Sequence, residues 1–452
     1  MHDDADREEY PSSTYAWYVV ALLTLAYVFS FIDRQILSLL VGPIRKDLGI
    51  GDKEMGLLMG ATFAVFYTLF GIPLGRLADT RSRRGLIAIG IAFWSLMTAG
   101  CGITKKFWEL ALMRMGVGVG EATLSPSAYS LIADYFRPER RATAMSVYSM
   151  GIYVGSGMAF ILGGMVVGFA SGQESFVVPL IGAVRSWQVV FFVVGLPGLA
   201  VALLTLTIRE PVRKGMRKSA GNQPPAFPLS EVLSYVWDNR ATFLCLNFGV
   251  AMVTLNAYGA TSWVPTFFVR RFGWTPQQTG MVFGLIVGLS GGLGIISGGW
   301  FSDWLNQRGH TDASPRVAWL AIMAWLPFGV AFPLAPTGPL AAALLVPALF
   351  FGSIPFGVAP AAIQQMMPNP MRAQATAIYL FVINLIGMGL GPTAVAVLTV
   401  DVFKDEKAVH HSLLVVGAIA HFTASILLWF SLRHYRESID YLKNWSREQA
   451  AR

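Results

Sequence analysis

The sequence predicts an all-α membrane protein with twelve transmembrane helices in two pseudo-symmetric six-helix bundles. Three observations predict it. Apolar residues make up 54% of the 452-residue chain and Asp, Glu, Lys and Arg only 13%. Twelve apolar segments are each long enough to cross a bilayer, which needs about 20 residues. A polar, proline-containing segment in the middle of the chain divides these segments six and six.

The low charge content excludes several classes of protein. A soluble domain usually carries roughly 25% charged residues, so this chain has too few to cover a water-exposed surface. A disordered or fibrous chain is excluded by the same composition. Cys101 and Cys245 lie in apolar runs, which favours packing roles over a disulfide or a metal site. The acidic start MHDDADREEY does not resemble a cleaved signal peptide.

The spans follow from runs of apolar residues. Only helices are expected, because lipid offers no partner for an open strand edge. In the first half the predicted spans are 17–40, 55–78, 86–104, 107–135, 142–170 and 187–208. In the second half they are 241–269, 277–302, 317–334, 339–366, 372–399 and 411–432.

Lys and Arg predict the orientation of these spans. The even-numbered gaps and both tails hold 21 of them, and the odd-numbered gaps hold 10. Because positive loops stay in the cytoplasm, both termini are expected there. The net charge of +8 therefore reflects membrane orientation, and we expect no nucleic-acid partner.

The chain divides at the central polar segment. It carries six basic residues and the run GNQPPAFP, which is typical of a linker. Within it, 230–238 could form a short helix along the bilayer surface. The predicted parts are an N-tail (1–16), a first bundle (17–208), a cytoplasmic linker (209–240), a second bundle (241–432) and a C-tail (433–452). The two bundles are equal, at 192 residues each.

Two short motifs recur in equivalent places of the two halves. Gly75-x-x-x-Asp79 follows the second span, and Gly299-x-x-x-Asp303 follows the eighth, 224 residues later. RATAMSVY (141–148), which opens the fifth span, aligns with RAQATAIY (372–379), which opens the eleventh, 231 residues later. Two parallel six-helix repeats joined by a basic linker are typical of a two-bundle transporter.

The motifs resemble those of a known family, the major facilitator superfamily. GRLADTRSRR (75–84) resembles its signature between the second and third spans, with departures at Thr80 and Ser82. RMGVGVGEA (114–122) resembles its fourth-span motif. FSFIDRQILSLL (29–40) together with 114–136 resembles the Spinster-like branch. This resemblance implies a transporter, and the branch is associated with export of lysolipids and sphingosine-1-phosphate.

Four charged residues lie inside the predicted spans and away from their ends: Asp33, Arg34, Arg114 and Glu121. A charge at bilayer depth costs roughly 2.5–3.5 kcal/mol on insertion scales, so such residues usually face a cavity and function there. At 1.5 Å per residue, Asp33 and Arg114 should lie at similar depths, and Glu121 should share a helical face with Arg114. We expect Asp33 and Glu121 to handle protons and Arg34 or Arg114 to hold an anionic head group. Glu121 is also a predicted substrate-binding residue. A structural ion pair is the alternative.

The second half offers neutral polar groups within its spans. Asn247, Thr254, Tyr258 and Asn384 are the predicted substrate-binding residues there, with interhelical hydrogen bonding as the alternative role. Charge in one bundle and an apolar, aromatic wall in the other suit a substrate with a charged head and a long apolar tail.

The loop motifs predict a cytoplasmic gate. Ion pairs between charged span ends could lock the inner side and break on opening; simple topology signalling by positive charge is the compatible alternative. The predicted gate residues are Gly75, Asp79, Arg83, Arg84, Asp134, Arg141, Asp303 and Arg372.

These features together predict a secondary active transporter, not an enzyme, that moves an amphipathic anion by alternating access. Protons are the expected coupling ion, and no cofactor or metal is expected. The expected setting is the bacterial inner membrane, with a lipid bilayer and a small amphipathic substrate as partners and a monomer as the working form. An organic-anion symporter or broad drug exporter of the same fold, and a non-transporting receptor or scaffold, are the alternatives.

Overall fold

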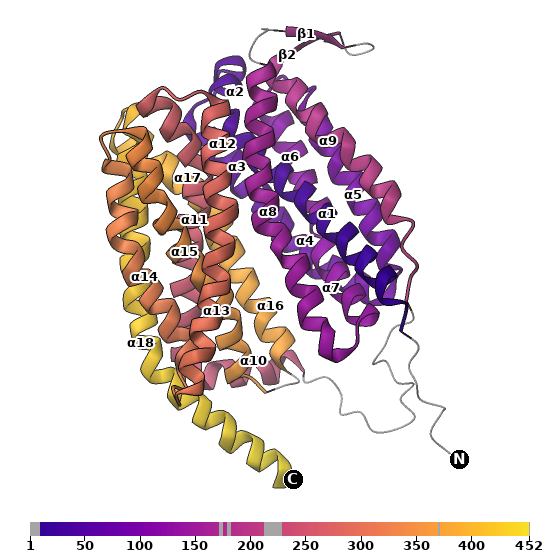
Figure 1. Ribbon diagram of the computed structural model, residues 1–452, viewed down its shortest axis with the longest axis vertical. Coiled ribbons are helices and arrows are strands. Elements are labelled where there is room, and N and C mark those ends of the chain that lie inside the picture. Colours follow the sequence, from indigo (N-terminus) through magenta and orange to yellow (C-terminus); the bar gives the residue numbers. More distant parts are fainter. Residues whose placement is uncertain (1–9, 171–174, 179–181, 212–227, 369–370, 452) are drawn as a thin grey trace. The chain divides into compact units, whose positions relative to one another are not determined.

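The computed structural model describes residues 10–170, 175–178, 182–211, 228–368 and 371–451, and these residues are almost entirely helical (Figure 1). Eleven helices or helical runs in this part of the chain are long and apolar enough to cross a membrane. The remaining predicted span, the fourth (107–135), is present as two shorter helices, α6 (Phe107–Glu121) and α7 (Leu124–Tyr135). The all-α, twelve-span prediction is therefore confirmed.

The predicted spans correspond closely to the helices. In the first half the elements are α1 (Ser13–Leu39), α2 (Val41–Leu48), α3 (Asp52–Met59), α4 (Ala61–Thr80), α5 (Arg83–Cys101), α6, α7, α8 (Pro138–Ala170), β1 (Ser175–Val178), β2 (Gly182–Arg185) and α9 (Ser186–Thr205). In the second half they are α10 (Leu229–Asp238), α11 (Arg240–Phe272), α12 (Pro276–Ile286), η1 (Val287–Gly291), α13 (Gly292–Gln307), α14 (Ala313–Ala331), η2 (Phe332–Leu334), α15 (Gly338–Met366), α16 (Arg372–Ile383), η4 (Asn384–Met388), α17 (Gly389–Val397), η5 (Leu398–Val402), η6 (Glu406–Ala408) and α18 (Val409–Ala451).

Irregular elements account for most differences from the predicted spans. The eighth and eleventh spans each contain π-helical turns, at η1 and at η4 and η5, rather than one uninterrupted helix. The antiparallel hairpin β1–β2 joins α8 to α9. The short helix expected at 230–238 is present as α10, whereas 212–227 of the predicted linker and 1–9 of the predicted N-tail lie outside the described residues.

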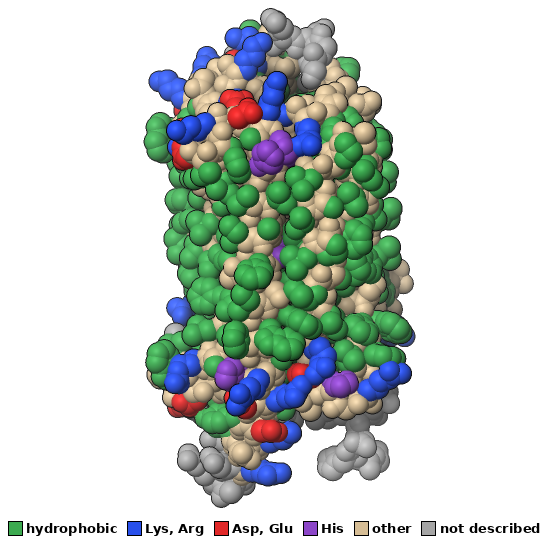
Figure 2. All heavy atoms as spheres, turned by 90° about the vertical axis from the view of Figure 1, so that its left-hand side faces the viewer, with side chains coloured by type: hydrophobic (Ala, Val, Ile, Leu, Met, Phe, Trp, Pro, Cys, Tyr) green, Lys and Arg blue, Asp and Glu red, His purple; other side chains and the backbone are tan. Residues whose placement is uncertain are grey.

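The outer surface of α18 and α14 is apolar between two charged ends (Figure 2). Large side chains exposed on α18 are Ile419, Phe422, Ile426, Trp429 and Phe430. Arg433, one turn further along, is almost fully exposed. Such a belt is the surface that a helical membrane protein presents to lipid, with basic residues at the level of the head groups.

Contacts divide the chain into two compact units. Unit 1 comprises Met1–Arg34, Phe66–Ala159 and Ala170–Asn222, and unit 2 comprises Gln35–Val65, Phe160–Phe169 and Gln223–Arg452. Two segments from the first half of the sequence therefore pack with the second half. The bundle boundaries 17–208 and 241–432 stay a prediction, since these units follow packing rather than position in the chain.

An ion cluster attaches the first of these segments within unit 2. Asp52, whose side chain is fully buried, accepts two hydrogen bonds of 2.7 Å from Arg270 on α11. Arg45 on α2 lies 3.2 Å from Asp52 and pairs with Glu406 at 2.5 and 2.8 Å. We call Arg45, Asp52, Arg270 and Glu406 the α2–α3 cluster. The hydrogen bond that Arg45 donates to Glu406, together with the charges of the nearby carboxylates, outweighs burial and raises the pKa of Arg45 above its usual range.

Glycines allow the same segments to pack closely. A Cβ on Gly56 of α3 would lie 2.9 Å from Cβ of Ala396 on α17. A Cβ on Gly164 of α8 would lie 2.9 Å from the carbonyl oxygen of Pro276 and 3.2 Å from Cα of Gly280 on α12. Such distances leave no room for a larger residue, and small residues of this kind let membrane helices approach backbone to backbone.

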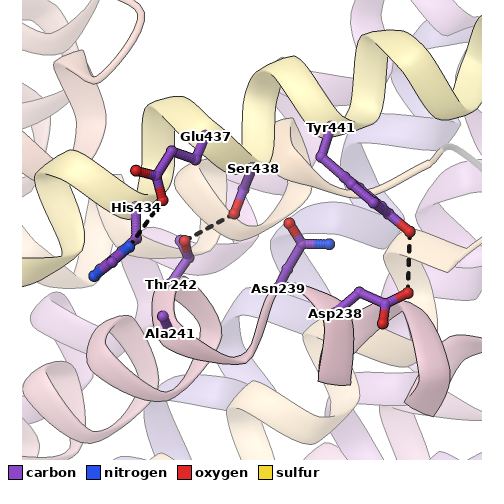
Figure 3. Close-up of a pocket in the computed structure, with 8 residues that line it drawn as sticks. All are labelled: Asp238, Asn239, Ala241, Thr242, His434, Glu437, Ser438 and Tyr441. Atoms are coloured by element: carbon purple, nitrogen blue, oxygen red, sulfur yellow. Dashed lines mark hydrogen bonds and ion pairs between the residues drawn. The ribbon is translucent and has the colours of Figure 1, made fainter.

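The predicted C-tail is not a separate helix, because α18 continues without a break to Ala451 (Figure 1). Figure 3 shows how this extension is attached around a small pocket. Tyr441 donates to Asp238 at 3.0 Å, and Ser438 shares a hydrogen bond of 2.8 Å with Thr242. The polar side chains of this pocket thus largely bind each other. Their hydrogen bonds attach α18 to the corner between α10 and α11.

A buried acid fixes α18 to α14 nearby. Asp312 accepts hydrogen bonds from Arg316 at 2.9 Å and from Arg436 at 2.7 Å. Burial raises the pKa of the Asp312 carboxyl, but these two arginines outweigh it, and the pKa lies below its usual range. The pairing therefore persists at neutral pH.

Candidate functional site

The buried charges predicted from the sequence meet inside unit 1. Glu121 is the last residue of α6, and its side chain has no exposed surface. Arg34 on α1 donates from Nε to Glu121 Oε2 at 2.5 Å, and the Arg34 side chain keeps 9% of its surface exposed. Ser30, one turn before Arg34, donates to the same oxygen at 2.8 Å. The structure thus pairs Glu121 with Arg34.

Arg114 and Asp33 form the neighbouring contact. Arg114 Nη1 donates to the backbone carbonyl oxygen of Asp33 at 3.0 Å, and both residues are almost completely buried. The charges of Asp33 and Glu121 both act on Arg114. In the part of the chain that the structure describes, Oδ1 of Asp33 and Oε1 of Glu121 have no hydrogen-bond partner. Each carboxyl therefore has an oxygen that can take a proton without breaking a hydrogen bond.

Close packing and a helix break place Glu121. α6 ends at Glu121, and the turn at Ala122 and Thr123 precedes α7. A Cβ on Gly120 would lie 2.8 Å from Cβ of Trp94 and 3.0 Å from the carbonyl oxygen of Gly90 on α5. The glycines of the fourth-span motif thus bring α6 against α5, which explains their presence next to the acid.

Aromatic rings surround Arg34. Its guanidinium carbon lies 4.9 Å from the ring centroid of Phe31 on α1 and 4.7 Å from that of Tyr67 on α4. These rings and Ser30 were not predicted, because aromatic and hydroxyl residues are common in membrane helices and only tertiary structure brings them to the arginine.

The predicted neutral groups of the second half lie in unit 2. Asn247 and Thr254 are buried, and each donates to the carbonyl one turn back, Phe243 or Val250, at 2.7 Å. Tyr258 and Asn384 are half-buried, and Asn384 opens the π-helical turn η4. Their roles in substrate binding stay predictions.

The predicted gate residues are only partly brought together. Within unit 1, Arg83 is buried, pairs with Asp134 and donates to Glu210 at 2.8 Å. The Arg84 backbone donates to Glu210 at 3.0 Å. Burial raises the pKa of Glu210, but hydrogen bonds, first of all from Arg83, outweigh it and leave the pKa below its usual range. Glu210 was not predicted from the sequence, since a charge in a loop is unremarkable there.

Three further predicted gate residues lie in the described part of the structure. Gly75 is half-buried in α4, Asp303 is exposed at the end of α13, and Arg372 is exposed and donates to the Met367 carbonyl oxygen at 3.2 Å. The side chains of Asp79 and Arg141 lie outside the described part of the structure. A gating role for all eight residues stays a prediction.

Comparison with known proteins identifies the family. Residues 23–435 match the model of the Major Facilitator Superfamily. An MFS-type efflux pump of Mycolicibacterium smegmatis is 27% identical over 96% of this chain and 97% of its own length. Protein spinster homolog 1 of Bos taurus is 32% identical over 70% of this chain, but the match spans only 60% of the bovine protein.

A solved structure agrees with these relatives. It is the crystal structure of a bacterial homologue of the human lysosomal transporter Spinster, in an inward-facing and unoccupied conformation, with a TM-score of 0.77 and 27% identity. The match covers 95% of this chain and 98% of that one. The protein is therefore an integral multi-pass membrane protein and a transporter rather than an enzyme. The chain belongs to the Major Facilitator Superfamily and is a transporter of the Spinster type.

Proposed function

We propose that this protein carries an amphipathic anion, such as a lysolipid, across the bacterial inner membrane by alternating access, together with protons. The observation that carries the proposal is the Arg34–Glu121 pair, in which a partly accessible guanidinium is bound at 2.5 Å by a buried carboxylate. Both termini lie in the cytoplasm in this proposal, as the distribution of Lys and Arg predicts. The working form is a monomer that uses no cofactor or metal.

The pair links proton binding to anion binding. While Glu121 is ionised, it neutralises Arg34 and competes with any incoming anion. Once Glu121 takes a proton, the charge of Arg34 is available to a phosphate or carboxylate head group, which guanidinium binds well. Proton and anion are therefore loaded together and move in the same direction. Asp33, with its unbonded carboxyl oxygen in the described structure, passes this proton to and from Glu121 in this proposal.

Arg34 is a better head-group ligand than Arg114. The Arg34 side chain keeps some exposed surface, whereas Arg114 is 1% exposed and already donates to the Asp33 carbonyl. Arg114 then acts by holding α6 to α1 and by placing positive charge beside both acids.

The apolar tail of the substrate is assigned to the second half of the chain. Among the described residues there, Asp, Glu, Lys and Arg lie towards the ends of the spans, and the middle carries aromatic, aliphatic and neutral polar side chains. The name of the Mycolicibacterium relative, an efflux pump, supports a broad-specificity exporter as the second candidate.

Affinity should rise with the length of the acyl chain. Each buried CH₂ contributes about 0.8 kcal/mol, so anionic lysolipids should bind about fourfold tighter per added CH₂ until the cavity is full. Calorimetry on the purified protein with lysophosphatidylglycerols of increasing chain length measures this. A hydrophilic-anion symporter would instead show flat affinity across the series and tighter binding of a short sugar acid or dicarboxylate.

The head-group assignment is tested with the same ligands. Arg34→Gln should weaken an anionic lysolipid at least tenfold and leave a neutral monoacylglycerol of the same chain length within twofold. Equal losses for both ligands would contradict a head-group role for Arg34.

A further inference from the structure

We propose that Tyr67 and Phe31 are positioning residues that hold Arg34 in place in both protonation states of Glu121. This inference rests on the proposed function in one respect, that Arg34 alternates between Glu121 and the substrate anion. It goes beyond that function by naming the contacts that hold the Arg34 guanidinium in position once Glu121 has lost its charge.

The two rings flank the guanidinium from different helices. Phe31 precedes Arg34 by three residues and shares a face of α1 with it, and its centroid lies 4.9 Å from the guanidinium carbon. Tyr67 approaches from α4, with its centroid at 4.7 Å. Both distances lie within the range of about 6 Å over which a cation is attracted to the face of an aromatic ring.

We call Phe31 and Tyr67 the aromatic clamp. Further aromatic side chains pack against its Phe31 ring. Tyr27 packs edge-on against Phe31, at 5.3 Å between centroids and 72° between planes. Tyr27 in turn stacks flat on the fully buried Tyr148, at 4.7 Å and 6°. Tyr129 packs edge-on against Tyr148 at 5.2 Å. Phe31 is thus fixed by packing and does not depend on Arg34 for its position.

The two kinds of contact respond differently to a proton. The ion pair with Glu121 weakens when the carboxyl is neutralised, whereas the quadrupole of an aromatic face has no proton to gain. The charged groups that face Glu121 are Arg34 and Asp33 from α1 and Arg114 from α6. The two rings attract the guanidinium of Arg34 through their faces, so this attraction does not require the charge of Glu121. An arginine has many rotamers, and contact with two ring faces restricts those that Arg34 can adopt when the anion binds.

Affinity for a charged probe tests the clamp. Tyr67→Leu should weaken binding of 1-oleoyl lysophosphatidylglycerol roughly tenfold, an effect between those of exposed and fully desolvated cation–π contacts, and leave neutral 1-oleoylglycerol within twofold. Tyr67→Phe keeps the ring and should restore the anion affinity. Phe70→Leu is the matched control. It also removes an aromatic ring from α4, but that ring stacks on Phe66.

A second readout needs no substrate. Phenylglyoxal modifies arginine side chains, and mass spectrometry of the purified protein gives the rate at Arg34. We expect Tyr67→Leu to raise this rate at least threefold, and Tyr67→Phe and Phe70→Leu to leave it unchanged. If Tyr67→Leu does not fold, Phe31→Leu takes its place in both measurements.

The outcomes separate the clamp from the proposed function. A faster reaction at Arg34 in Tyr67→Leu, with no lysolipid bound by any form of the protein, supports the clamp and rejects the lysolipid substrate. An unchanged rate at Arg34 in both leucine variants overturns the clamp. Equal defects in Tyr67→Leu and Tyr67→Phe also overturn it, because they assign the effect to the hydroxyl group instead of the ring.

Discussion

Replacing Glu121 with Gln should abolish the pH dependence of transport while the protein stays folded. Gln has the size of Glu and can still accept hydrogen bonds from Ser30 and Arg34, but it cannot ionise. Arg34 then remains available to the anion at every pH. With one proton per anion, a gradient of one pH unit drives about tenfold accumulation in the native protein, and the variant should show none.

Transport assays in proteoliposomes over a range of pH measure this effect. Exchange of labelled substrate against unlabelled substrate should survive in Glu121→Gln, since binding and alternation need no proton there. Asp33→Asn is the comparison variant, because Asp33 belongs to the same cluster. An unchanged pH profile in Glu121→Gln would remove Glu121 from the proton path.

Replacing Asp52 with Asn should destabilise unit 2 by about 3 kcal/mol, the lower end of the cost of breaking a buried ion pair. The Asp52 side chain is fully buried and takes two hydrogen bonds from Arg270, so the variant leaves two arginines, Arg270 and Arg45, around a neutral amide. The lower value applies because the side chains of Arg270 and Arg45 are 14% and 19% exposed, and Glu406 still lies near both of them. A lower midpoint of thermal unfolding in detergent is the expected result.

The Lys53–Asp401 pair provides the control for this prediction. It lies in the same unit at 2.5 Å, but both side chains are more than 40% exposed, so Asp401→Asn should cost at most about 1 kcal/mol. The destabilised variant should also loosen the packing of α3 on α17, which spin-label distances would report. Equal unfolding midpoints for wild type, Asp52→Asn and Asp401→Asn would contradict the structural importance of the α2–α3 cluster.

The spans were predictable because few backbone structures can cross a bilayer with all their polar groups hydrogen-bonded. Apolar length alone located the twelve spans, and most helices begin or end within a few residues of the predicted positions. The helix break after Glu121 was not predicted, although Pro126 was a signal for it, because a proline ring crowds the carbonyl group four residues earlier, here that of Ala122. The breaks at η1 and η4 escaped prediction because π-helical turns depend on tertiary packing.

The charged residues of the site were predictable individually, but their pairing was not. Charge inside an apolar run is conspicuous, so Asp33, Arg34, Arg114 and Glu121 could be selected from the sequence. Helical periodicity placed Glu121 on the same face as Arg114, whereas in the structure Glu121 pairs with Arg34. A long arginine side chain reaches across helices, and periodicity describes only one helix at a time.

The α2–α3 cluster lay beyond sequence reasoning for a different reason. Arg45, Asp52 and Glu406 lie at or beyond the ends of spans, where charged residues are expected and therefore carry no signal. Only the fold brings residues 45, 52, 270 and 406 together. The same applies to Glu210, which lies in a different loop and pairs with Arg83, the partner of Asp134.

The most direct test of the central claim, that proton and anion share Arg34 and are loaded together, is the pH inside proteoliposomes. The lumen contains a pH-sensitive dye, no initial pH gradient is present, and an anionic lysolipid is added outside while its uptake is followed in parallel. We expect lysolipid entry to acidify the lumen with the native protein and to leave its pH unchanged with Glu121→Gln. Lysolipid entry that makes the lumen more alkaline, or that leaves its pH unchanged with the native protein, would contradict the claim.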